Sequence, residues 1–144
     1  MSDDVKALQQ ALAGEHATIW AYGAIGAHAS DDHLGAVGAA DNAHRAQRAA
    51  LEELIRSLGQ EPEPSKPGYT LPSPVTDDAT AVALAATLED AMGTHWRYCC
   101  GRVSSAPIRT FCVDALITST TAALQWRRLA GDAAAVAPAL PGLS

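Results

Sequence analysis

Four side chains of the kinds that bind metals or transfer protons stand at regular positions in this chain: Glu15, Asp41, His44 and Glu89. Asp41 and His44 are three residues apart, so in a helix both project from one face. Three carboxylates and one imidazole supply ligands that suit iron, manganese or zinc. Buried carboxylates are costly unless they are paired, hydrogen-bonded or metal-bound. The four residues therefore predict either a metal site or a buried polar network.

Each of these residues lies on the apolar stripe of an expected helix, with steps of three and four residues. The stripes are Val5, Leu8, Leu12, Glu15, Ile19, Tyr22 and Gly26; Leu34, Val37, Asp41, His44, Arg48, Leu51, Ile55 and Leu58; Val82, Ala85, Glu89, Met92, Trp96, Cys99 and Val103; and Ile108, Phe111, Ala115, Thr118, Ala122, Gln125 and Leu129. Glu15 and His44 lie at similar distances from the first expected turn, and Glu89 and Thr118 at similar distances from the last. Antiparallel packing would place all four in one central layer.

Composition favours helices. The chain has 144 residues, 31 of them alanine, and alanine is the best helix former. Five of the eight prolines fall within residues 62–74, so that segment is expected to be a loop. The net charge of −6 argues against a nucleic-acid binder, and no apolar run approaches the roughly 20 residues that span a bilayer. Without a signal-peptide pattern at the N-terminus, we expect a cytoplasmic protein with no membrane partner.

Capping residues set the expected boundaries. The first helix follows a Ser2 cap and reaches about Ala29; the second is capped by Asp31 or Asp32 and ends at Leu58, before Gly59; the third starts at Thr76-Asp77-Asp78 and reaches about Val103; the fourth is capped by Ser105 and ends near Gly131. We expect one domain over residues 1–131, with a crossover loop at about 59–76, and a tail at 132–144. Two hairpins joined by a long crossover favour a four-helix bundle over a non-bundle helical array.

The pattern resembles the ferritin-like superfamily, whose di-iron members carry one Glu on each of two helices and a Glu-x-x-His pair on each of the others. Glu15 and Glu89 match the single Glu residues, and Asp41-Asn42-Ala43-His44 matches one pair with Asp in place of Glu. Three segments resemble a bacterial ferritin-like domain family of unknown function over about residues 5–130: LAGEHATIWAYGAIGAH, NAHRAQRAALEELI and YTLPSPVTDDATAVALAATLEDAM. The resemblance implies an all-α, ferritin-like four-helix bundle of two antiparallel hairpins, and no settled activity.

The fourth helix lacks the second pair, because the positions equivalent to Asp41 and His44 are occupied by Ala115 and Thr118. Three interpretations remain open: a two-metal centre with missing ligands, a single metal ion, or a metal-free network in which an Arg48 fork neutralises a glutamate. We favour the network. We therefore expect a degenerate metal site, no assigned catalytic residue and no cofactor, in a binding or structural protein.

The alternative is an iron- or manganese-dependent oxidoreductase that uses Glu15, Asp41, His44 and Glu89. A homodimer is expected as well, because a face containing Gly23, Gly26, Gly35 and Gly38 would allow close approach of a partner helix. A small-molecule ligand is not identified by the sequence. A bundle with three histidines in one layer, as in some thiol transferases and metal hydrolases, is disfavoured because only His44 lies on a stripe.

The remaining reactive or bulky side chains receive structural predictions. Cys99 and Cys112 are expected to approach each other across the last hairpin as reduced thiols, next to Cys100. His28 and His33 flank the first turn. The large aromatic residues are expected to anchor the core or a dimer interface: Trp20, Tyr22, Trp96 and Trp126.

Overall fold

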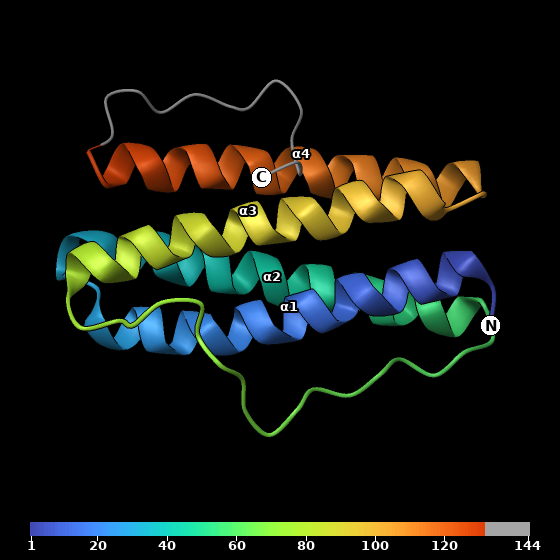
Figure 1. The fold of residues 1–144 in the computed structure, drawn as a ribbon, viewed down its shortest axis with the longest axis horizontal. Helices are drawn as coiled ribbons and strands as arrows, with labels where there is room; N and C mark the ends of the chain where they lie inside the picture. The colour runs from blue at the N-terminus through green and yellow to red at the C-terminus, as the bar shows by residue number, and fades with distance from the viewer. Residues whose placement is uncertain (132–144) are drawn as a thin grey trace.

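The computed structural model describes residues 1–131, which form four α-helices and no strand (Figure 1). The helices are α1 (Asp3–His28), α2 (Asp31–Ser57), α3 (Asp78–Arg102) and α4 (Ala106–Leu129). The all-α prediction is confirmed, and each helix begins and ends within about two residues of its expected bounds. The predicted tail at 132–144 lies outside the described residues.

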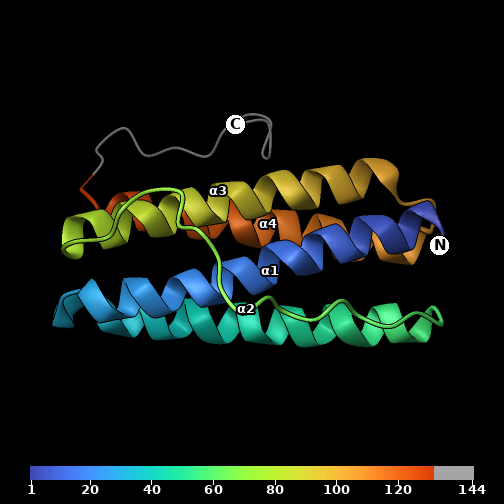
Figure 2. The same cartoon turned by 60° about the horizontal axis from the view of Figure 1, so that its bottom comes forward.

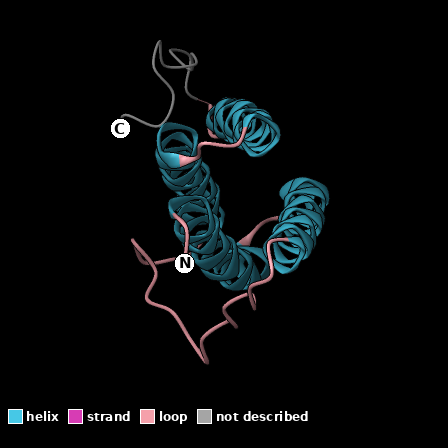
Figure 3. Ribbon diagram, turned by 90° about the vertical axis from the view of Figure 1, so that its right-hand side faces the viewer, coloured by secondary structure: helices cyan, strands magenta, loops and turns pink. Residues whose placement is uncertain are grey.

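The helices pack as two antiparallel hairpins. α1 packs on α2 and on α3, and α3 packs on α4. A crossover at residues 58–77 leaves the end of α2 and runs back along the outside of the bundle to the start of α3 (Figures 1 and 2). Viewed along the helices, the four form an arc that is open on one side (Figure 3). The opening lies between α2 and α4, which make hardly any contact with each other.

Two of the four helix starts, those of α1 and α3, are capped by predicted side chains, whereas the predicted Ser105 stands at the N-cap of α4 without a side-chain hydrogen bond. The Ser2 hydroxyl accepts a hydrogen bond from the Val5 backbone, and Asp77 forms a reciprocal capping box with Thr80. The cap of α2 differs from the prediction, because Ser30, and neither of the two aspartates that follow it, precedes the first helical residue. Those aspartates lie in the first turn, where negative charge complements the helix dipole.

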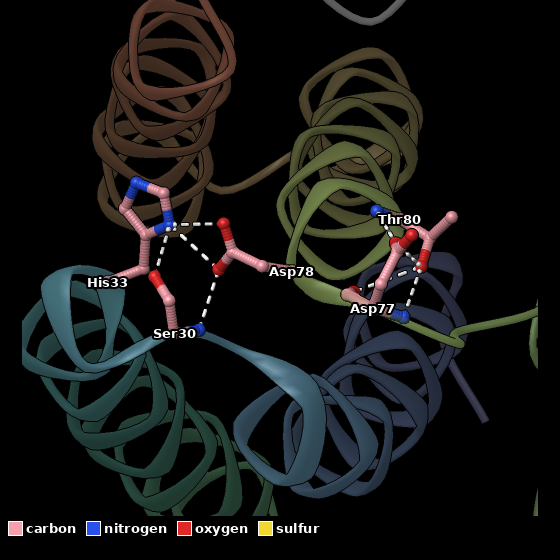
Figure 4. Close-up of polar contacts among 5 residues, drawn as sticks. All are labelled: Ser30, His33, Asp77, Asp78 and Thr80. Atoms are coloured by element: carbon pink, nitrogen blue, oxygen red, sulfur yellow. Dashed lines mark hydrogen bonds and ion pairs between the residues drawn. The ribbon is translucent and has the colours of Figure 1, made fainter.

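A hydrogen-bonded latch joins the turn between α1 and α2 to the start of α3 (Figure 4). The Asp78 carboxylate accepts a hydrogen bond from the Ser30 backbone N–H at 2.7 Å, and its oxygens lie 2.8 and 3.0 Å from Nδ1 of His33. The Ser30 bond, followed by the His33 contact, lowers the pKa of Asp78. At the opposite end, Asp4 accepts backbone hydrogen bonds from Ser104 and Ser105, which ties α1 to the last turn.

The crossover is held on α1 by side chains rather than by secondary structure. The Gln9 side chain donates to the carbonyl of Glu61 and accepts from the backbone N–H of Glu63. Nε2 of His16 lies 2.9 Å from the Glu63 carbonyl. Trp20, 41% exposed, packs against Tyr69 of the crossover and therefore is not a core anchor within this chain.

Two apolar clusters fill the bundle, one toward each end. The first includes Leu8, Leu12, Leu51, Ile55, Met92 and Trp96, and the second includes Tyr22, Ile25, Val37, Val82, Leu84 and Trp126. The first also holds Cys99 and Cys112, both buried and free. The prediction that these two thiols approach each other across the last hairpin is confirmed by their place in one cluster, and the neighbouring Cys112 together with burial raises the pKa of Cys99.

Burial is unequal among the helices. α1 buries fourteen residues and α3 eleven, whereas α2 buries only four and α4 six. Those of α4 are Ile108, Cys112, Ala115, Ser119, Ala123 and Trp126. The predicted α4 stripe was therefore wrong beyond Ala115: Thr118 and Gln125 are exposed, and their C-terminal neighbours are buried. An α-helix repeats every 3.6 residues, so its buried face drifts from a strict heptad stripe.

None of the helices within residues 1–131 combines the length and the apolar content that a bilayer-crossing segment needs.

Candidate functional site

A polar layer lies at the middle of the bundle, between the two apolar clusters. The layer consists of one residue from each of three helices: Glu15 of α1, His44 of α2 and Glu89 of α3. Nδ1 of His44 lies 2.6 Å from Oε2 of Glu15, and its Nε2 lies 2.7 Å from Oε1 of Glu89. His44 thus bridges two carboxylates that are 1% and 2% exposed. The sequence prediction that these three residues share one layer is confirmed.

Two aromatic residues extend this layer toward α4. The Tyr22 hydroxyl donates to Oε1 of Glu89 at 2.7 Å, and it accepts a hydrogen bond from Nε1 of Trp126 at 3.0 Å. Both aromatic side chains are buried. The resulting chain of hydrogen bonds runs from Glu15 through His44, Glu89 and Tyr22 to Trp126, and it links all four helices.

His44 carries a positive charge in this setting. Burial disfavours the imidazolium, but the hydrogen bonds to Glu15 and Glu89 and their negative charges outweigh it and raise the pKa of His44 to about 10. Both ring nitrogens then donate a hydrogen bond. Burial raises the pKa of Glu15, against the opposing effect of His44. Burial and the neighbouring Glu89 carboxylate likewise raise the pKa of the Tyr22 hydroxyl, which stays protonated as a donor.

The other predicted members lie outside the layer. Oδ2 of Asp41 pairs with Nε of Arg45, one turn along the exposed side of α2, at 2.8 Å. The predicted Arg48 fork on Glu15 or Glu89 is not among the contacts of residues 1–131, because His44 takes that place. Asp41 lies one turn from both Val37 and His44, which are buried residues of α2, but its own side chain is only half-buried and pairs with Arg45 instead of entering the layer.

A groove between α2 and α4 opens directly over this layer. Its volume is about 450 Å³, within the range of small-molecule sites. The α2 wall consists largely of alanines, including Ala39 and Ala43, and the α4 wall carries Thr118, Ser119 and Gln125. Glu15, His44 and Glu89 line its floor, and Trp96 and Trp126 line it as well.

The residues of the layer do not fit the two-metal centre that the ferritin-like pattern implies. Such a centre takes carboxylates and histidines from all four helices. Here α4 supplies Ala115, Ser119 and Ala122 at that level, Asp41 is paired with Arg45, and both nitrogens of His44 already contact carboxylates. Within residues 1–131, no group of three or more histidine, cysteine, aspartate or glutamate side chains is arranged to hold a metal ion.

Sequence reasoning missed the roles of Tyr22 and Trp126. Tyr22 follows Glu15 by seven residues on the same stripe, so its hydroxyl was a candidate partner for a polar residue of the layer. Trp126 was displaced from the predicted stripe by one residue, which is the phase error described above for α4.

This arrangement of helices is a ferritin-like fold. A crystal structure described as ferritin-like, diiron-carboxylate proteins from Bacillus anthracis str. Ames matches with a TM-score of 0.76 and 19% identity, over 90% of this chain and 99% of that one. At that identity the match shows the fold alone. No curated protein matches the chain.

The family is shown by sequence. The model of a domain of unknown function, DUF4439, matches residues 7–144, and the chain belongs to that family. A conserved hypothetical protein, rv2844, from Mycobacterium tuberculosis has a crystal structure that matches with a TM-score of 0.85 and 33% identity. The match covers 88% of this chain and 96% of that one. The predicted resemblance to a ferritin-like family of unknown function is therefore confirmed.

Proposed function

We propose that this protein is a non-catalytic binding protein, in which a histidine-bridged carboxylate pair has replaced the metal centre of a ferritin-like bundle. The observation that carries the proposal is the position of His44 between Glu15 and Glu89. Its imidazolium neutralises part of the carboxylate charge and uses both nitrogens as donors, which is the charge compensation that a cation would otherwise provide. The groove above this layer is the proposed binding surface.

The competing function is an iron- or manganese-dependent oxidoreductase with Glu15, Asp41, His44 and Glu89 as ligands. The two functions predict different metal contents. Protein purified without chelators and loaded with iron(II) or manganese(II) should hold far less than one ion per chain, measured by elemental mass spectrometry after gel filtration. Glu15→Ala and His44→Ala should lower the thermal midpoint and leave the metal content unchanged.

Asp41→Ala is the matched control, because the Asp41 pair with Arg45 is exposed and such pairs contribute about 0.5 kcal/mol or less. This variant should resemble the wild type in stability. Stoichiometric metal that is lost in Glu15→Ala or His44→Ala would overturn the proposal in favour of the oxidoreductase.

The predicted homodimer and cytoplasmic location stay predictions. Gly23, Gly35 and Gly38 have open space where a side chain would begin, which would let a partner helix approach α1 and α2.

A further inference from the structure

The floor of the groove between α2 and α4 carries more acidic than basic groups. Among the described residues that line it, the ionisable ones are Glu15, His44 and Glu89. Two carboxyl groups thus face one imidazole at the base of a largely apolar groove. Low polarity around a charge strengthens its interaction with an opposite charge, so an anion is repelled and a cation attracted.

The hydrogen bonds of the layer leave acceptors for a ligand. His44 and Tyr22 engage Oε2 of Glu15 and Oε1 of Glu89. The second oxygen of each carboxylate takes part in no hydrogen bond among the described residues, and both side chains line the groove. An ammonium group has three donors and no acceptor, which matches this set of acceptors. The Ser119 hydroxyl on the α4 wall adds another acceptor.

The walls fit an apolar body attached to that charge. Alanines on α2 leave width for a flat group, and Ile117 and Leu129 of α4 add apolar surface. Trp96 and Trp126 line the groove, and indole is the aromatic group that attracts cations most strongly. The volume of about 450 Å³ is larger than a bare inorganic ion requires.

We propose that this groove binds an organic cation, a primary amine carried on an aromatic or branched apolar body. The proposal rests on the proposed binding function and deepens it by naming the ligand class. The ammonium group lies over the free oxygens of Glu15 and Glu89, and the apolar body extends between the α2 alanines and the α4 wall.

Isothermal titration with three probes of matched size tests the proposal at pH 7.5. The probes are 2-phenylethylamine, which is cationic, 2-phenylethanol, which is neutral, and 3-phenylpropanoate, which is anionic. The amine should bind about tenfold or more tightly than the alcohol, because a charge-assisted hydrogen bond contributes that much. The anion should not bind. Added sodium chloride should weaken only the amine.

Two kinds of variant locate the site. Ala43→Phe fills the groove from the α2 wall without altering the polar layer, and it should abolish binding of the amine. Ala49→Phe places the same side chain at an exposed position of α2 outside the groove, and it should bind like the wild type. Glu15→Gln should reduce affinity for the amine about tenfold and leave the alcohol unchanged.

Equal binding of amine and alcohol would overturn the ligand class while leaving the proposed binding function in place. Binding that persists in Ala43→Phe would place the site elsewhere and overturn the proposal. Sedimentation velocity provides the last check. A dimer that dissociates in Ala43→Phe and persists in Ala49→Phe would mean that a second copy of the chain covers the groove. That result would also overturn the proposed ligand. The proposed binding function is tested by a different measurement: it fails if the protein holds stoichiometric metal that is lost in Glu15→Ala or His44→Ala.

Discussion

The four helices of the bundle fall into two pairs that are packed differently: α1 with α3, and α2 with α4. α1 and α3 each pack on two other helices and present long buried faces, whereas α2 and α4 face each other across an open groove. α2 is the clearest case, because alanines cover much of its surface and only Val37, His44, Leu51 and Ile55 are buried. Its His44 side chain also reaches Glu89 of α3, a helix that α2 scarcely contacts otherwise. The polar layer therefore adds to the few apolar contacts that hold α2, whereas apolar packing dominates for α1 and α3.

The largest difference in the free energy of unfolding should appear when a leucine of α1 and a leucine of α2 are each replaced by alanine. Leu12→Ala on α1 removes a fully buried side chain and should lower the free energy of unfolding by about 3 kcal/mol, since it leaves a cavity. Leu34→Ala on α2 removes a side chain that is 42% exposed and should cost about 0.5 kcal/mol. Urea denaturation measures both. Equal losses would mean that α2 is packed more fully than its burial indicates.

The polar layer should give the next largest effect. Glu15→Gln removes the charge that faces His44 while keeping the shape, and it should cost about 2 kcal/mol because the buried imidazolium loses a charged partner. Asp41→Asn changes an exposed pair of α2 that does not line the groove, and it serves as control. If the Glu15→Gln protein is as stable as Asp41→Asn, the polar layer does not help to position α2.

Alkaline pH should weaken the same layer. The folded-state pKa of His44, about 10, lies above the ordinary value of 6.5, so its stabilising contribution is fully present below about pH 6.5 and is lost as pH rises toward 10. The free energy of unfolding should therefore fall with pH above neutrality, by about 1.4 kcal/mol per pH unit at most. Urea denaturation at several pH values measures this slope. Between pH 7 and about 8, below the range in which cysteines and tyrosines titrate in the unfolded chain, the slope should be absent in His44→Gln, and a slope that persists there would assign it to another group.

The smallest effect should come from the latch at the end of the bundle. Asp78→Asn removes a charge that His33 and the Ser30 backbone hold at the start of α3. The loss of stability should be smaller than for Glu15→Gln, because the latch is partly exposed to solvent. Amide hydrogen exchange should speed up in the turn between α1 and α2 and stay unchanged at the polar layer. Faster exchange at His44 would show that the latch and the layer form one cooperative unit.

The sequence predicted the helices well because their signals are local. Ser2, Asp77 and the proline-rich crossover mark boundaries through caps and backbone restrictions that require no tertiary contact. Glu15, His44 and Glu89 were placed in one layer by counting from the turns, which works for antiparallel helices of equal rise. Asp41, Arg48 and Thr118 were misplaced, since a position on an idealised stripe does not fix the rotation of each helix about its axis.

Four helices, a long crossover and three polar residues at one depth follow from the amino-acid order, because periodicity and capping are properties of the chain. Only the folded structure shows that His44 bridges both carboxylates, that Tyr22 and Trp126 join them, and that α2 and α4 stay apart over a groove. These features depend on how far each helix is rotated and how closely two helices approach. Small side chains such as alanine permit several such arrangements, and the contacts of the folded chain select one of them.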